Sequence, residues 1–241
     1  MLINDFFSET VNYRRAVRKF HSSGFEKESV RKSLELAILS PSSSNMHLYQ
    51  FIRITNAELK KKVAFCCLNQ SAASTATELI VLAIRPDLYK RRASFNLQKI
   101  MELNPERKSL DGKGAEYYYS KLIPLLYFND RFGFVGIFRK LVQFFRGMRK
   151  PTVREVSKND IRIVLHKSAA LAAQTFMLSM ASAKQDTCPI EGYDSKRLKK
   201  LLNLNKDSEI NMVIACGIRD IGGIYNERIR TNLEEMVTEL S

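Results

Sequence analysis

The clearest candidates for chemistry are arginines near both ends of the chain. Five of them fall in two short segments, NYRRAVRKF and NERIR: Arg14, Arg15, Arg18, Arg228 and Arg230. A guanidinium fork binds two oxygens of one phosphate group, so each segment could clamp a phosphate. Charged runs also occur as ordinary solvated faces of a protein, and that alternative stays open.

A cluster of small polar residues, PSSSN, interrupts the chain at 41–45. Pro41 must end the preceding helix, because a residue before proline is pushed out of the α region. The hydroxyl groups of Ser42 and Ser43 and the amide of Asn45 could hydrogen-bond the polyol or the ring edge of a ligand. Residues of these types also serve as caps and turns, so a purely structural loop is the alternative.

The segment CPIEGYD (188–194) follows an apolar stretch. Pro189 lacks a backbone donor and is expected to fix a turn, and Gly192 lets a ligand approach the backbone closely. Backbone N–H groups held in such a turn can donate to a ring heteroatom without any side chain. An ordinary turn is again the alternative.

The cysteines and histidines do not indicate a metal site. The chain has four cysteines, Cys66, Cys67, Cys188 and Cys216, with no CxxC pattern. No two of its three histidines lie four residues apart on one helix face. The cysteines are therefore expected to be reduced, buried thiols, and no metal is expected.

Composition indicates a globular chain with an anionic partner. Of the 241 residues, 45% are hydrophobic and 27% are charged, and we expect one domain over 1–241 with a divergent segment at about 87–160. The net charge of +14 favours a phosphorylated cofactor, nucleic acid or an anionic membrane surface. Nucleic acid is the least expected, because no helix-turn-helix, RNP or zinc motif is present.

The expected location is the cytoplasm. The longest uncharged run, 168–183, is shorter than the ~20 residues that cross a bilayer, and the N-terminus lacks the basic and apolar parts of a signal peptide.

Hydrophobic periodicity predicts a mixed α+β (α/β) fold around a small central sheet. The helix predicted at 168–183 is apolar almost all round and should be buried on most sides. The other predicted elements are helices at 26–39, 57–67 and 194–203 and strands at 49–55, 79–84 and 210–217.

The segment 131–150 carries six cations and no acidic residue. One face of the helix predicted there carries Val135, Phe138, Val142, Phe145 and Met148. Such a helix could lie on a membrane, shield a site, or pack on its own domain with a solvated basic face. We expect a soluble protein whose apolar stripe points inward, and membrane association is the less favoured interpretation.

Together and in this order, the segments resemble the FMN-dependent nitroreductase family. The matching pieces are RRAVRKF, PSSSNMHLYQF, NQ (69–70) before LIVLAI, PIEGYD, and the basic residues near 230. The resemblance implies a three-layer fold, with a small mixed sheet wrapped by helices, and a homodimer with FMN at its interface. Three departures stand out: Ala16 replaces a serine, HLY (47–49) replaces Gln-Pro-Trp, and Lys184 stands where a glycine is common.

The resemblance also implies roles for the candidate residues. Arg18 would lie near the N1–O2 edge of the flavin, Asn69 would face its pyrimidine edge, and the backbone amides of Glu191 and Gly192 would point at N5 and O4. Pro189 and Ile190 complete that motif. Arg14, Arg15, Arg228 and Arg230 would bind the phosphate and ribityl chain. Pro41, Ser42, Ser43 and Asn45 would reach the flavin of the other subunit.

The implied activity is that of an FMN oxidoreductase. It would pass a hydride from NAD(P)H through flavin N5 to an acceptor such as a nitroaromatic or a quinone, and no side chain is nominated as catalytic. One alternative is a relative that acts on a non-nitro substrate, for example by reductive dehalogenation. The other is an anionic-surface-binding protein with a vestigial flavin site.

Overall fold

A five-stranded sheet forms the centre of the computed structural model, which describes residues 5–103, 114–128 and 133–240. The strand order is β1-β5-β3-β2, and β4 pairs with β5. All of these strand pairs are antiparallel, and an isolated parallel bridge joins Ala16 to Thr187. The strands are β1 (Phe20–His21), β2 (Tyr49–Ile54), β3 (Glu78–Ile84), β4 (Asp186–Ile190) and β5 (Glu209–Arg219).

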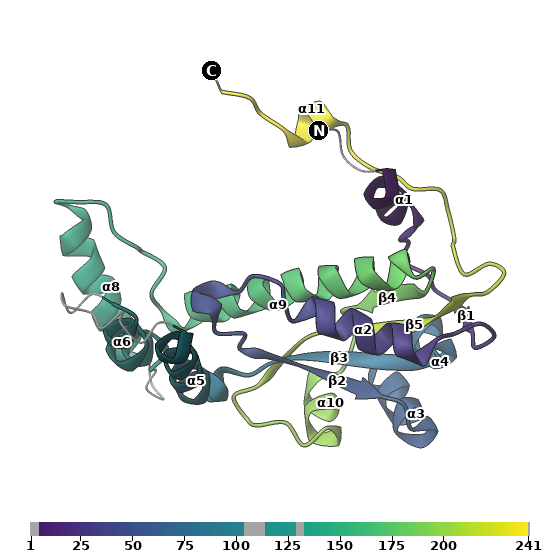
Figure 1. Ribbon diagram of the computed structural model, residues 1–241, viewed down its shortest axis with the longest axis horizontal. Coiled ribbons are helices and arrows are strands. Elements are labelled where there is room, and N and C mark those ends of the chain that lie inside the picture. Colours follow the sequence, from purple (N-terminus) through teal and green to yellow (C-terminus); the bar gives the residue numbers. More distant parts are fainter. Residues whose placement is uncertain (1–4, 104–113, 129–132, 241) are drawn as a thin grey trace.

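Helices cover both faces of the sheet, and Figure 1 shows the resulting three layers. Because both faces are covered, β3 is buried at every residue, and after Glu78 it is a continuous apolar run. α2 (Lys27–Ala37) and α9 (Lys158–Ser182) cover one face. α3 (Ala57–Cys66), α4 (Ser71–Thr75) and α10 (Ser195–Leu201) cover the other. The expected fold class, and the strands and helices predicted around this core, are confirmed.

α9 is longer than the sequence predicts, and one of its faces is open. It begins at a capping box, in which Ser157 and Asp160 satisfy each other's backbone donors. Ala169, Ala173 and Phe176 on its inner face are fully buried. Leu171 on the opposite face is half exposed, so the expectation of burial on most sides is wrong for the single chain.

Pro189 lies inside a strand and does not fix a turn. It belongs to β4, opposite Ile214 of β5, and the turn begins only after Ile190. Among the named strands, β4 pairs with β5 alone, so its other edge has no neighbouring strand. The missing N–H of Pro189 therefore costs no hydrogen bond to a second strand.

The middle of the chain forms a group of helices beyond one end of the sheet (Figure 1). Its elements are α5 (Tyr89–Leu103), α6 (Ala115–Tyr117), a π-helical turn (Tyr118–Leu122), α7 (Ile123–Tyr127) and α8 (Phe134–Gly147). Of the stripe predicted at 131–150, Val135 and Val142 are half-buried, whereas Phe138, Phe145 and Met148 are exposed. The inward-pointing stripe is therefore wrong, and Arg131 lies outside the described residues.

The two ends of the described chain extend away from the sheet at its other end (Figure 1). α1 (Asp5–Tyr13) precedes β1, and an arm after β5 ends in the short helix α11 (Leu233–Met236). None of the described helices has the length and apolar character needed to span a membrane. The single-domain organisation stays a prediction.

Candidate functional site

Four of the predicted arginines gather at one place. Burial lowers the pKa of Arg14, and the nearby charges of Arg228, Arg230 and Arg15 lower it further. Burial is the larger cause, and the mutual repulsion of these positive charges adds to it. An anion bound among them would relieve that repulsion.

The contacts of these arginines differ. Arg228 Nη2 donates to the carbonyl oxygens of Val11, Asn12 and Arg14 at 2.8–3.1 Å, so part of this guanidinium satisfies the C-terminal end of α1. Arg15 Nη2 donates to Asn226 O at 2.5 Å. The C-terminal arm is thereby fastened to the residues that follow α1, which brings both predicted arginine segments together.

Arg18 is exposed on the same side, beside β4. Its backbone N–H donates to Gly223 O at 2.6 Å. A side chain at Gly223 would come within 2.6 Å of Lys19 O, so this close approach requires a glycine. Burial raises the pKa of the Cys188 thiol, and the charges of Arg18 and Arg14 partly offset that rise. Both arginines therefore lie near Cys188.

The turn after β4 faces solvent at the end of the same strand. Glu191 and Gly192 are exposed, about 10 Å along the chain from Cys188 at ~3.3 Å per residue. Gln70 Nε2 donates to Gly192 O at 2.6 Å, which places the neighbouring Asn69 beside this turn. Asn69 itself is exposed and has a left-handed backbone, with φ of 50°.

Gln70 was missed as a site residue, although it directly follows Asn69 in the NQ pair. A side chain at Gly192 would lie 2.9 Å from Gln70 Nε2, so the glycine and the glutamine fit each other. Hydrogen-bonding partners on a distant segment leave no local pattern in a sequence.

The PSSSN loop is bonded to the middle of α9, whereas the arginines lie near the C-terminal end of that helix. Ser43 N donates to Ser168 Oγ, whereas the hydroxyl of Tyr13, which directly precedes Arg14, donates to Lys184 O. The helical rise of ~1.5 Å per residue separates Ser168 from the end of α9 by about 21 Å. A single chain therefore does not bring Ser43 to the arginine cluster, whereas the bond from Ser40 Oγ to Thr175 Oγ1 places the neighbouring Pro41 nearer to the arginine end of α9.

The backbone of the PSSSN loop and of the residues directly after it is strained. Positive φ angles between 44° and 54° occur at Ser44, Asn45 and His47. Residues of the middle segment hold it there. Tyr119 OH donates to Ser44 O at 3.0 Å, and Asn96 Nδ2 donates to Asn45 O at 2.8 Å. Tyr118 OH lies 2.6 Å from Ser44 Oγ. These contacts join segments far apart in the chain and have no local pattern in the sequence.

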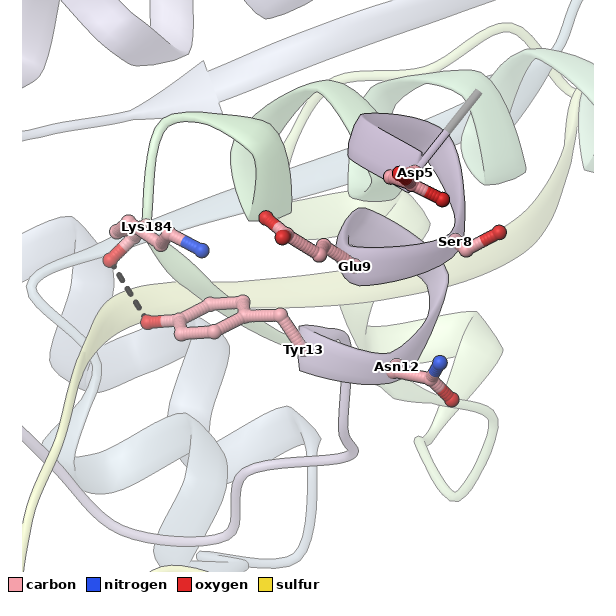
Figure 2. Close-up of a pocket in the computed structure, with 6 residues that line it drawn as sticks. All are labelled: Asp5, Ser8, Glu9, Asn12, Tyr13 and Lys184. Atoms are coloured by element: carbon pink, nitrogen blue, oxygen red, sulfur yellow. Dashed lines mark hydrogen bonds between the residues drawn. The ribbon is translucent and has the colours of Figure 1, made fainter. Parts of the chain in front are cut away.

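An open pocket of about 570 Å³ lies between α1 and the end of α9 (Figure 2). Its lining residues are Asp5, Ser8, Glu9, Asn12, Tyr13 and Lys184. Lys184 has φ of 56°, which explains why a glycine is common at this position of the family pattern. None of the predicted flavin-contacting residues lines the pocket.

No cluster of metal-ligating side chains occurs in the part of the chain that the structure describes. The four cysteines are buried, and burial raises the pKa of each thiol. They are structural in this arrangement.

Comparisons with known proteins identify the family of most of the chain. The family model described as the nitroreductase family matches residues 11–218. MhqN of Bacillus subtilis, a provisionally assigned NAD(P)H nitroreductase, is 23% identical over 214 residues, which cover 88% of this chain and 87% of MhqN.

Solved structures show the same fold. A provisionally assigned nitroreductase of Exiguobacterium sibiricum in complex with FMN has a TM-score of 0.67 and 20% identity, with 100% of this chain and 99% of that chain covered. The NADPH:FMN oxidoreductase of Vibrio harveyi, complexed with NAD⁺, has a TM-score of 0.61 and 17% identity, with 98% and 77% covered.

The family match spans the first arginine segment, the PSSSN loop, the PIEGYD turn and the divergent middle segment. The resemblance read from the motifs is confirmed. At the level of the family, the oxidoreductase class is also confirmed, and so is the expected use of FMN as cofactor and NAD(P)H as co-substrate. The chain belongs to the nitroreductase family.

Proposed function

We propose that this protein is an FMN-dependent oxidoreductase that takes a hydride from NAD(P)H and passes electrons to a small-molecule acceptor. One observation carries the proposal. Arg14 and Arg18 lie near Cys188 of β4, and the exposed turn of backbone donors begins about 10 Å further along the chain, at Glu191. That layout fits a phosphate joined to a ring through a short polyol.

The arginine cluster fits the phosphate end of the cofactor. Arg14 is half-buried among Arg15, Arg228 and Arg230, and Arg14 has no hydrogen bond to a carboxylate among the described residues. The three bonds of Arg228 to carbonyls all use Nη2, which leaves its Nη1 and Nε donors for another acceptor. A dianionic phosphate is the partner that this donor set prefers.

The turn after β4 fits the ring end. Glu191 and Gly192 offer exposed backbone N–H groups, Asn69 offers an amide beside them, and Arg18 offers a positive charge. Such a charge stabilises the anionic reduced form of a flavin, in the way that an oxyanion hole stabilises a developing charge. The flavin supplies the hydride chemistry, and these residues supply position and charge.

A homodimer completes the proposed site. Ser43 bonds to α9 about 21 Å along the helix from its arginine end, so we infer that Pro41, Ser42, Ser43 and Asn45 contact a flavin bound by another subunit. Large apolar side chains near this loop and on α9 are exposed in the single chain, among them Leu39 and Leu171. Their burial would favour the association of two subunits.

The test is anaerobic reduction of the FMN-loaded protein. We expect NADH or NADPH to bleach the visible flavin absorbance, and a nitroaromatic or a quinone to restore it, with two electrons delivered to the acceptor per hydride supplied. Comparison of nitroaromatic, quinone and halogenated acceptors identifies the substrate class. Failure of either nicotinamide to bleach the flavin would contradict the proposed function and leave a binding protein.

A further inference from the structure

α8 presents a continuous apolar face to solvent. Seven large side chains on this face are each between 53% and 71% exposed, a degree that buried core residues never reach. They are Phe134, Ile137, Phe138, Leu141, Phe144, Phe145 and Met148. Exposed apolar patches of this size mark interaction surfaces.

The orientation of α8 is fixed by contacts on its other side. At about 100° per residue, the seven apolar side chains fall within an arc of ~120°. Gly136 on the opposite side is buried against Ser157, where a Cβ would lie 3.6 Å from Ser157 Cα. Gln143 bonds to Thr152, and Arg139 donates to the carbonyl oxygens of Leu125 and Phe128. The apolar arc therefore points away from the protein.

The charge along α8 and directly after it in the sequence has one sign. Lys140 borders one edge of the arc and Arg146 lies beyond the other, and Arg149 and Lys150 follow the helix. No acidic residue occurs between Arg131 and Arg154. An apolar face with cations along its flanks is complementary to the surface of an anionic bilayer, where acyl chains lie beneath negative headgroups.

We infer that α8 docks on the surface of an anionic phospholipid membrane. The helix lies parallel to the surface, with its apolar arc in the headgroup region and its cations among the phosphates. Its 14 residues extend over about 21 Å, which is long enough for interfacial binding and too short to cross the bilayer. This inference goes beyond the proposed function and does not depend on it.

The C-terminal arm of a second copy is the competing occupant. It carries exposed Leu233 and Met236 together with Glu234 and Glu235, so its charge is opposite to that of α8. However, α11 has four residues and extends over about 6 Å, less than a third of the face. A membrane surface covers the whole arc and both cationic flanks at once, and we therefore favour it.

The absence of tryptophan from the chain provides a direct test. In the full-length Phe138→Trp variant, the indole emission reports only on α8. We expect a blue shift with vesicles that contain phosphatidylserine and none with vesicles of phosphatidylcholine alone, and we expect high salt to reverse it. Phe65→Trp, at a similarly exposed position on α3, is the matched control and should not shift.

A charge reversal separates electrostatic docking from unspecific adhesion. Each cation near an anionic leaflet changes the affinity about 5-fold, so Lys140→Glu combined with Arg149→Glu should weaken co-sedimentation with anionic vesicles by ~30-fold or more. The same reversal at Lys61 and Lys62 on α3 changes the net charge equally and should leave vesicle binding within a few-fold.

Three results would overturn the inference. The first is no emission shift of the Phe138→Trp variant with anionic vesicles. The second is equal weakening by the two charge reversals, which would mean that the overall charge alone attracts the protein. The third is a Phe138→Trp variant whose emission is already blue-shifted without vesicles and moves to the red when the protein is diluted. That result would mean that a second copy of this chain covers the face.

Discussion

Arginine side chains in this protein differ in whether a carboxylate neutralises their positive charge. Arg53 pairs with buried Glu78, and Arg219 pairs with buried Asp186. Arg14 instead lies among other arginines. The composition shows the excess of positive charge, but only the fold shows where that excess is concentrated. The proposed phosphate site rests on this difference between arginines that are paired with a carboxylate and arginines that are not.

Removal of one arginine from the cluster should weaken FMN binding. Arg14→Ala deletes a charge-assisted hydrogen bond worth about 1.5–3 kcal/mol, so the dissociation constant should rise roughly 10- to 150-fold. Titration of the apoprotein with FMN measures it. Arg31→Ala on α2, where the arginine is exposed and paired with Glu35, is the control. Equal affinities for Arg14→Ala and the parent would assign the phosphate to other residues.

The buried thiols should make the fold sensitive to alkaline pH. Burial and the neighbouring Cys66 raise the pKa of Cys67 to about 12 from an ordinary value of 9.0, and burial also raises the pKa of Cys216. The unfolded chain therefore loses these protons first as pH rises, and ionisation favours unfolding.

We expect the free energy of unfolding to fall between pH 8 and pH 10, by up to ~1.4 kcal/mol per pH unit for each thiol above its unfolded pKa. Urea denaturation across this range measures the slope, and Cys67→Ala should reduce it. A constant free energy of unfolding would contradict the buried state of the thiols.

The secondary-structure elements could be predicted from the sequence where a strand is buried on both faces or a helix is buried on one face. β3 is buried on both faces, so its apolar run identified it, and α2 showed helical spacing because one face packs on α9. β4 was missed because it has five residues and contains Pro189. The α8 stripe was assigned inward, because an apolar face normally packs on its own domain, and periodicity does not show which side a neighbour covers.

The middle segment should control the PSSSN loop through hydrogen bonds. Tyr119→Phe removes the donor to Ser44 O and should cost about 1 kcal/mol of stability, because a partly buried carbonyl loses its partner. Chemical denaturation measures this cost. Tyr117→Phe, at a half-exposed tyrosine two residues away, should cost less than half as much. Equal effects of the two variants would mean that the loop holds its strained backbone without this contact.

In the whole molecule, the candidate residues lie at two separate places, the PSSSN loop and the arginine end of α9. This separation limits what the sequence could predict. Motif order indicated one flavin site, and each motif is present in the fold. Motifs do not show distances, so the ~21 Å between Ser43's position on α9 and the arginine end became visible only in the structure. The contacts of Gln70, Asn96 and Tyr119 join segments far apart in sequence and had no local signal.

The two-subunit site predicts that FMN and association are linked. Because a flavin held by residues of both chains binds only the assembled state, FMN should shift the equilibrium toward the dimer. Sedimentation velocity with and without FMN, at protein concentrations near the dimer dissociation constant, measures the shift. A stable monomer with FMN fully bound would contradict the shared site.

In the proposed site, the arginines beside α1 hold the phosphate of a flavin mononucleotide whose ring lies at the turn after β4. FMN and riboflavin differ only in that phosphate, so their dissociation constants for the apoprotein test the claim most directly. We expect FMN to bind at least ~10-fold more tightly than riboflavin, with the difference reduced in Arg14→Ala, because each charge-assisted contact contributes about 1.5–3 kcal/mol. Equal affinity for the two flavins would contradict the account.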